Sequence, residues 1–322
     1  MSLAATSGWP MLADVIDRFA VEAPAAVARG RAALHGTLAP LDGSAWPEVA
    51  WRFSDIAPGG FPAELIWRPG CPGLFWTAEP APPEIPAKDR MPAALRRLDA
   101  LGTALPSASV ALARRAAVMG NGRGIWLGGR HDADGDRYKL YVGTGPTAAD
   151  LLREADAWRP MSTVGLRLFH LGLDSTGRVE LYWRRRRYEP GDLASLGRTT
   201  NLVSAASRLR AGLATLCGRD PDLALEGRRL AYSVQIDSRG LPEALALFCA
   251  LPASFLGGEH RTLAWLEAQV GVNVASVAAI LWRQGLLRPS WIGVTATTDR
   301  LSSHIGFMLR APGVTLGGRP GA

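Results

Sequence analysis

The same pattern of two short strand-like runs joined by a turn recurs five times along the 322-residue chain. Each turn contains the Gly, Asp or Ser residues that β-hairpins require. An internal repeat of this kind constrains the fold more strongly than composition does. The expected hairpins are 48–56 with 61–68 and a further run at 74–78, 124–130 with 137–142, 164–173 with 178–184, 230–236 with a run inside 241–251, and 291–297 with 303–309.

Stretches rich in alanine and leucine, with the spacing of helices, separate the hairpins. Antiparallel hairpins divided by helices cannot form a doubly wound parallel sheet, in which single strands alternate with crossover helices. The order of elements therefore predicts an α+β protein. The expected helices are 11–19, 24–34, 91–101, 107–119, 148–158, 203–217 and 262–283.

Five hairpins supply ten strands, and helices on one face of the sheet would leave its other face uncovered. Closure into a ten-stranded antiparallel β-barrel removes both sheet edges and hides that face. Such a barrel, surrounded by a ring of α-helices, has a lumen wide enough to hold a ligand. We expect one barrel domain over residues 1–322, with about five αββα repeats and a short disordered tail from about residue 314. The alternative is an open α+β sheet that packs on another subunit.

The composition is that of a globular chain with an anionic partner. Hydrophobic residues make up 48% of the chain and charged residues 20%, and the formal net charge is +7. The arginines are scattered, so we expect a small anionic ligand and no nucleic acid.

No apolar run is long enough to span a membrane and no signal peptide is evident, which predicts a cytoplasmic protein. We expect it to be a monomer or a weak homodimer. The three cysteines lie far apart with no histidine pair nearby, and we expect no metal site.

Three of the expected second strands share one register. Because side chains alternate between the two faces of a strand, Glu64, Lys139 and Glu180 lie on one face together with Tyr141 and Tyr182. A leucine takes the opposite face in each strand, which suits the side covered by helices. The charged and phenolic side chains are therefore expected inside the barrel. The aligned segments are 62–67, 137–142 and 178–183.

Cationic and phenolic side chains that converge on a partly dry cavity need a counter-charge. A diphosphate supplies it, since Lys and Arg hold phosphate oxygens through charge-assisted hydrogen bonds and tyrosine hydroxyls donate further ones. The alternative is that these residues lie on exposed strand faces of an open sheet, with an interstrand ion pair between Glu180 and Lys139.

Three short motifs resemble those of fungal dimethylallyltryptophan synthases. The segment 60–64 resembles their Gly-x-Pro-x-Glu, 139–141 their Lys-x-Tyr, and 178–182 their Arg-x-Lys-x-Tyr, with Glu180 in place of the lysine. In length the chain is closer to the cyanobactin-type peptide prenyltransferases, which share the barrel. It departs from the fungal pattern where 74–76 lacks an arginine and 245–252 lacks a lysine. The residues that could substitute are Arg52, Arg137 and Arg229.

The resemblance implies a prenyltransferase of the αββα-barrel type. It would transfer a dimethylallyl or geranyl group from its diphosphate to an aromatic or peptide side-chain acceptor, in the tailoring of natural products. Glu64 would orient the acceptor and accept its proton. The diphosphate would be held by Lys139, Tyr141, Arg178 and Tyr182. The alternatives are a prenyltransferase of a small indole or phenol, and a non-catalytic barrel that binds an apolar ligand.

An allylic cation also needs shielding from water and stabilisation by aromatic faces. We expect no tightly bound cofactor, and Mg²⁺ is possible but required by no motif. The acidic stretch 132–136 is expected to be a hairpin turn, because its glycine and glutamate spacing does not fit a calcium loop. The candidates for the shield are Trp126, Phe169, Phe248, His304 and Phe307.

Overall fold

The computed structural model describes residues 10–19, 23–42, 54, 56, 61–82, 84–145, 166–250, 280 and 284–309. The expected helix at 148–158 and the tail from about 314 lie outside the described residues. The expected helix at 262–283 and the expected strand at 48–56 lie almost entirely outside them.

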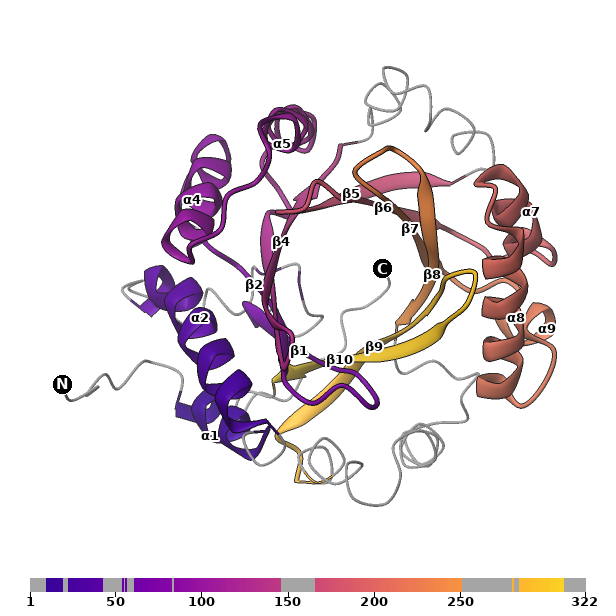
Figure 1. The fold of residues 1–322 in the computed structure, drawn as a ribbon, viewed down its shortest axis with the longest axis horizontal. Coiled ribbons are helices and arrows are strands. Elements are labelled where there is room, and N and C mark those ends of the chain that lie inside the picture. The colour runs from indigo at the N-terminus through magenta and orange to yellow at the C-terminus, as the bar shows by residue number, and fades with distance from the viewer. Residues whose placement is uncertain are drawn as a thin grey trace.

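Ten antiparallel strands form a closed barrel in the order β1-β10-β9-β8-β7-β6-β5-β4-β3-β2 (Figure 1). The predicted ten-stranded antiparallel barrel is thus confirmed. Closure leaves no unpaired sheet edge between these strands. The strands are β1 (Ala63–Trp67), β2 (Leu74–Ala78), β3 (Trp126–Asp132), β4 (Gly135–Gly143), β5 (Arg167–Asp174), β6 (Val179–Arg185), β7 (Leu230–Ile236), β8 (Pro242–Ala250), β9 (Leu287–Ala296) and β10 (Leu301–Leu309).

Helices surround the barrel on its outer side, as Figure 1 shows. Four of the expected helices appear close to their expected bounds, α2 continues beyond its expected end through Pro40, and α7 and α9 were not expected. None of the helices in the described parts of the chain is long and apolar enough to cross a membrane. The helices are α1 (Pro10–Phe19), α2 (Pro24–Asp42), α4 (Ala87–Ala100), α5 (Ser107–Met119), α7 (Asp192–Thr199), α8 (Val203–Cys217) and α9 (Pro221–Leu225).

The first hairpin differs from the expectation. Strand β1 pairs with β2, with Glu64 opposite Thr77, and on its other side with β10, with Glu64 opposite Met308. Both edges of β1 are therefore occupied, and the expected pairing of 61–68 with 48–56 is wrong. The run at 74–78, noted as an extra strand, is the true partner of β1.

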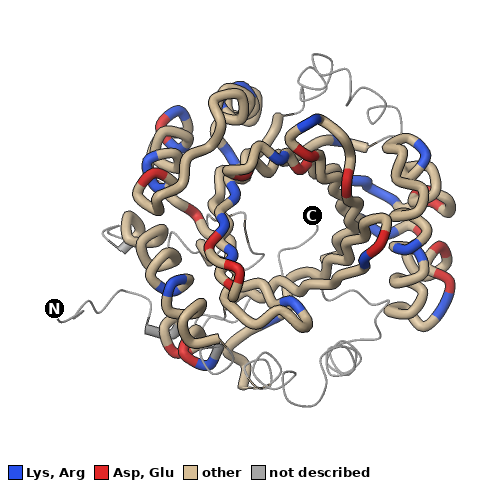
Figure 2. Tube along the Cα trace, in the orientation of Figure 1, with Lys and Arg blue, Asp and Glu red and all other residues tan. Residues whose placement is uncertain are grey.

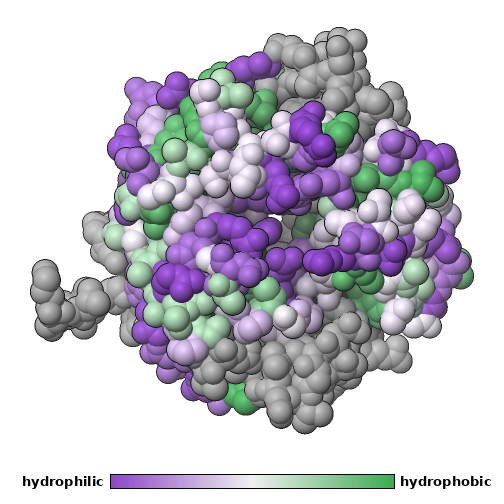
Figure 3. All heavy atoms as spheres, viewed as in Figure 1, coloured by the Kyte–Doolittle hydropathy of each residue, from purple (hydrophilic) through white to green (hydrophobic). Residues whose placement is uncertain are grey.

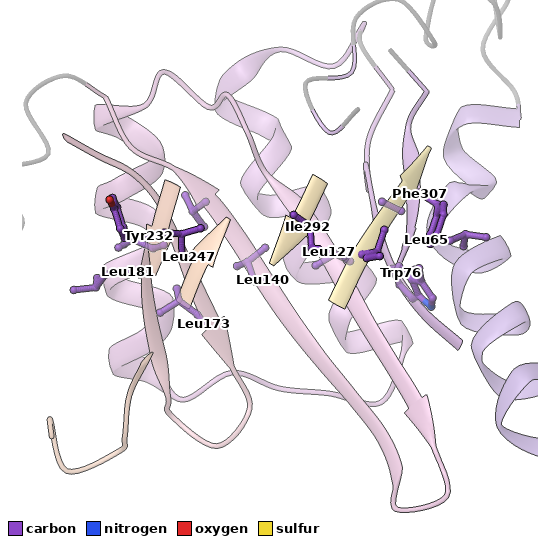
Figure 4. Packing of buried hydrophobic residues seen from close by; sticks show 14 of the residues in the cluster. Leu65, Trp76, Leu127, Leu140, Leu173, Leu181, Tyr232, Leu247, Ile292 and Phe307 are labelled. Carbon is purple, nitrogen blue, oxygen red and sulfur yellow. The ribbon is translucent and has the colours of Figure 1, made fainter. Parts of the chain in front are cut away.

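The hydrophobic core lies between the barrel wall and the helices. One face of each strand supplies it, with Leu65, Leu127, Leu140 and Leu181 all buried there (Figure 4). This confirms that the leucine face of the aligned strands is the outer one. Because side chains alternate along a strand, the residues next to these leucines point into the lumen.

The two ends of the barrel are built differently. The turn within each hairpin lies at one end, which we call the hairpin end, and the connections through helices lie at the other, the helix end. A residue's distance along its strand from the turn therefore gives its depth in the lumen. The hairpin turns are 68–73, 133–134, 175–178, 237–241 and 297–300.

Candidate active site in the barrel lumen

A buried carboxylate lies on the lumen face of β1 towards the helix end. Glu64 is 3% exposed and accepts hydrogen bonds from Ser290 Oγ and from Trp291 Nε1, the latter at 2.6 Å from Glu64 Oε2. The register of β9 against β10 shifts between Gly306 and Phe307. This bulge leaves Ser290 without a directly paired residue, so that Ser290 and Trp291 can both reach the same carboxylate.

Gly306 makes room for this arrangement. A Cβ atom at position 306 would lie 2.2 Å from Trp291 Nε1 and 2.8 Å from Glu64 Oε1. Only a glycine therefore allows the indole and the carboxylate to meet across β10.

The environment of Glu64 favours its neutral form at moderately acidic pH. Burial raises the pKa of Glu64 to about 7, and the hydrogen bonds from Ser290 and Trp291 only partly oppose this effect. The carboxyl group thus titrates close to neutral pH. Such a group can accept a proton from a reacting molecule and release it again.

A second carboxylate in the lumen has the opposite character. Glu180 Oε2 accepts a hydrogen bond from Lys139 Nζ at 2.5 Å, and Ser233 Oγ donates to Glu180 Oε1. Burial alone would raise the pKa of Glu180, but the Lys139 charge and the hydrogen bonds from Lys139, Ser233 and Tyr182 outweigh burial and lower it to about 2. Glu180 is therefore ionised at neutral pH and is the counter-charge of Lys139. The ion pair foreseen for an open sheet is real, but it lies inside a closed barrel.

Two arginines bring further positive charge towards the hairpin end. Arg68 follows β1, with its guanidinium carbon 5.7 Å from the centre of the Phe75 ring, and Arg130 lies on the lumen face of β3, opposite Arg137. Burial lowers the pKa of Arg68, and the neighbouring charge of Arg130 adds to this effect. The two cations are thus close enough to repel each other. Charged segments on the barrel wall are visible in Figure 2.

A continuous series of aromatic rings runs around the lumen. The ring centroids are 6.5 Å apart for Trp126 and Tyr141, 5.9 Å for Tyr141 and Tyr182, 5.8 Å for Tyr182 and Phe248, and 5.6 Å for Phe248 and Trp291. The series, which we call the aromatic arc, ends at the indole that donates to Glu64. Lys139 Nζ lies 5.8 Å from the centre of the Tyr141 ring, so the arc connects Lys139 with the protonatable carboxylate.

Further rings join the arc from β5. Phe169 lies at a register shift of β5, with its ring centroid 4.9 Å from that of His170 and 6.4 Å from that of Tyr182. The Arg184 guanidinium carbon lies 4.1 Å from the centre of the Phe169 ring. The His170 ring also stacks on Trp126, with centroids 4.3 Å apart. The structure thus brings Phe169 and Trp126 together with Tyr141 and Tyr182.

Phe307 is a correction to the expected shield. It is fully buried in the core outside the barrel wall, as Figure 4 shows, whereas His304 lies on the lumen face of the same strand. The two positions are three residues apart, and an odd separation along a strand places side chains on opposite faces. The expectation that both line the lumen was therefore inconsistent with strand geometry.

The remaining expected cations are not gathered around Lys139. Arg137 pairs with Asp132 and Arg178 with Glu243, at 3.2 Å, and both arginines are about half exposed at the hairpin end. Hydrophilic side chains surround the central opening in the view of Figure 3. Arg229 precedes β7 at the helix end and is exposed, and Arg52 lies outside the described residues.

Sequence reasoning missed several lumen residues. Strand alternation across the last hairpin, counted from His304, would have predicted that Trp291 lies on the lumen face. The bulge that directs Ser290 towards Glu64 has no recognisable pattern in the sequence. Glu79, another buried carboxylate, lies just beyond β2 and accepts hydrogen bonds from Trp126 Nε1 at 3.2 Å and Ser54 Oγ at 3.1 Å. Among the described residues, no group of three or more histidine, cysteine, aspartate or glutamate side chains is placed to hold a metal ion.

No protein-family model matches the sequence, and no curated protein matches it in sequence. Solved structures do resemble it. The 5-dimethylallyl tryptophan synthase from Streptomyces coelicolor, in complex with DMASPP and Trp, is 16% identical with a TM-score of 0.70, and the match covers 96% of this chain and 98% of that one.

Two further solved structures agree with that match. The 6-dimethylallyltryptophan synthase from Micromonospora olivasterospora is 16% identical, with a TM-score of 0.67 and coverage of 94% and 97%. NotF, in complex with brevianamide F and DMSPP, is 14% identical, with a TM-score of 0.65 and coverage of 96% of both chains. The chain therefore has the barrel fold of these prenyltransferases along nearly its whole length.

Proposed function

We propose that this protein is an aromatic prenyltransferase, which transfers an allylic isoprenoid from its diphosphate to an electron-rich aromatic acceptor. One observation carries the proposal. A single lumen contains the cations Arg68, Arg130 and Lys139, the aromatic arc, and, at the Trp291 end of the arc, Glu64, a carboxyl group with a pKa raised to about 7. Prenyl transfer needs an anion site, a shield for a cation and a proton acceptor, arranged in this order.

The cationic part of the lumen would hold the leaving group. Arginine and lysine bind phosphate oxygens through charge-assisted hydrogen bonds, and the hydroxyl of Tyr141 can donate a further one, whereas the hydroxyl of Tyr182 already donates to Glu180. When the bond between C1 of the prenyl group and the diphosphate oxygen breaks, the bonding electron pair leaves with the diphosphate. The fixed positive charges stabilise the negative charge that grows on it.

The aromatic arc would hold the allylic cation until the acceptor attacks. The faces of Tyr141, Tyr182 and Phe248 stabilise a cation and exclude water. A carbon of the acceptor ring forms the new bond to the prenyl carbon, and the ring then loses a proton to restore its aromaticity. Ionised Glu64 lies at the end of the arc and can take that proton.

The acceptor and the donor chain length are further parts of the proposal. The similar 5-dimethylallyl tryptophan synthase is in complex with DMASPP and Trp, and NotF is in complex with brevianamide F and DMSPP. We propose dimethylallyl diphosphate as the donor and an indole as the first acceptor to test, free or within a peptide. We also propose a cytoplasmic enzyme of one domain over residues 1–322, a monomer or weak homodimer, with no tightly bound cofactor.

Incubation with dimethylallyl or geranyl diphosphate and a panel of tryptophan, tyrosine and cyclic peptides tests the proposal. We expect an acceptor whose mass increases by one prenyl unit, together with an equal amount of released diphosphate. If no acceptor in the panel is prenylated and no diphosphate is released, the proposal is wrong.

The Glu64→Gln variant separates an enzyme from a carrier. A barrel that only stores an apolar ligand has no need of a proton acceptor, so the variant would bind its ligand as the wild type does. The proposed enzyme should retain donor binding and lose turnover.

A further inference from the structure

A histidine with no role in the steps above lies among the lumen cations. His304 is on the lumen face of β10, and its Nδ1 atom is buried without a hydrogen-bond partner among the described residues. The continuation of β1 places Arg68 beside it, because Trp67 pairs with Ile305. A buried polar nitrogen without a partner is costly and calls for an explanation.

The surroundings of His304 fix its ring position. The imidazole centroid lies 5.1 Å from that of Trp291 and 5.6 Å from that of Phe248, and both rings meet it edge to face. A Cβ atom at Gly293 would lie 2.5 Å from His304 Nε2, so the glycine leaves the space that the imidazole fills. The ring is therefore held in one place between the aromatic arc and the cations.

The charges that act on His304 are mainly positive. Burial and the charges of Arg68, Arg130 and Lys139 together lower the pKa of His304 to about 3, with burial as the largest cause, whereas the charge of Glu180 opposes them. The imidazole is thus neutral in the free protein at neutral pH. The negative charge of a bound diphosphate would act against both the burial and the three cations, because it favours a protonated ring.

We propose that His304 takes up a proton when a diphosphate binds in the lumen, and that the imidazolium then donates a hydrogen bond to a diphosphate oxygen. The inference rests on the proposed function, since it assumes that a diphosphate occupies this part of the lumen. The protonated ring would add a fourth positive charge to the site at the moment when the leaving group needs it. Because Glu180 already neutralises Lys139, a protonated His304 would restore positive charge that the diphosphate can bind.

Two measurements on the full-length protein test the proposal with inorganic pyrophosphate as the probe. In protein labelled with ¹⁵N-histidine, the imidazole signal that is missing from His304→Asn should move from the neutral to the imidazolium position when pyrophosphate is added. The signal of His131, which lies on the outer face of β3 and bonds to Asp136, is the internal reference. His304→Gln serves as a second variant if His304→Asn does not fold.

The second measurement is the pH dependence of pyrophosphate affinity. Proton uptake and ligand binding are reciprocally linked, so affinity should fall with rising pH more steeply in the wild type than in His304→Asn, with a difference of up to about tenfold per pH unit, which is the limit for one proton. Pyrophosphate itself titrates near neutral pH, but it does so equally with the wild type and with His304→Asn. The difference between their pH profiles therefore reports on His304.

The outcomes separate the inference from the proposed function. If pyrophosphate binds both proteins with the same pH dependence and the His304 signal stays neutral, the inference is overturned and the prenyltransferase proposal stands. If neither pyrophosphate nor dimethylallyl diphosphate binds the wild type and no transfer occurs, both fail together.

Discussion

Glu64 and Glu180 are both buried carboxylates on the lumen face of the same barrel, yet their pKa values are shifted in opposite directions. The pKa of Glu64 rises to about 7, because burial dominates and only the neutral donors Ser290 and Trp291 oppose it. The pKa of Glu180 falls to about 2, because Lys139 more than compensates for burial. One carboxylate can therefore exchange a proton near neutral pH, and the other cannot.

The two pKa shifts assign different roles to the two carboxylates: Glu64 is the candidate proton acceptor, and Glu180 has a structural role. Carboxylates whose surroundings push their pKa values apart have different roles, and the titrating one is the candidate acid or base. Glu180 instead balances the charge of a buried lysine. Sequence alignment to the known motifs showed only that a glutamate replaces a lysine at position 180. That Glu180 pairs with Lys139, and that its pKa is lowered, is known only from the fold.

Glu64→Gln should have the largest effect on activity. A glutamine can still accept a hydrogen bond from Trp291, but it cannot take a proton. We expect kcat to fall by about 10²- to 10⁴-fold with donor affinity unchanged. Steady-state kinetics and donor binding measure this, and retention of wild-type kcat would show that the proton goes elsewhere.

Lys139→Met should have the largest effect on stability. It leaves Glu180 inside the lumen without its cation, which costs about 3–5 kcal/mol of unfolding free energy. Urea or guanidinium denaturation measures the loss. The double variant Lys139→Met/Glu180→Leu should regain most of it, whereas a single variant as stable as the wild type would mean that the pair is not formed.

The pH dependence of stability should show the two carboxylates separately. The native pKa of Glu64 lies above its ordinary value of 4.5, so its contribution declines as pH rises from about 4.5 through 7, by about 3 kcal/mol. The native pKa of Glu180 lies below 4.5, so its contribution is present above pH 4.5 and declines as pH falls towards 2.

Two variants assign these slopes. Glu64→Gln should remove the decline towards neutral pH and Glu180→Gln the decline in acid, as followed by denaturation at a series of pH values. If both variants alter the same limb of the profile, the contrast between the carboxylates is wrong.

The smallest effects should come from two phenylalanines on opposite faces of the barrel wall. Phe248→Leu removes a ring from the aromatic arc, and we expect kcat to fall by about three- to thirtyfold, in line with about 0.5–2 kcal/mol of cation–π stabilisation. Phe307→Leu removes a ring from the outer core and should cost about 1 kcal/mol of stability with kcat unchanged. Equal kinetic effects would mean that the arc does not shield a cation.

The repeated hairpins predicted the barrel because each one has its own turn residues and its own alternation of side chains between the two strand faces. The register of Lys139 with Tyr141 and of Glu180 with Tyr182 was fixed by alternation within single strands. Contacts that depend on which strands become neighbours were not accessible in this way. Trp291 reaches Glu64 across 227 positions of sequence, through a bulge that no local pattern signals.

The first hairpin and Phe307 show the two ways in which prediction failed. For the first hairpin, the strand at 61–68 had two candidate partners, 48–56 and 74–78, and pairing with β10 on one edge leaves only the other edge, which β2 occupies. For Phe307, alternation would have excluded the lumen had it been applied from His304. The same closure brings Arg68 and Arg130 together, although no motif joins them.

A crystal structure with dimethylallyl thiolodiphosphate and tryptophan tests the division of the lumen most directly. The account predicts the diphosphate group within hydrogen-bond distance of Arg68, Arg130 and Lys139, and the indole between the aromatic arc and Glu64. A donor bound outside the barrel, or a diphosphate at the Glu64 end of the lumen, would contradict it.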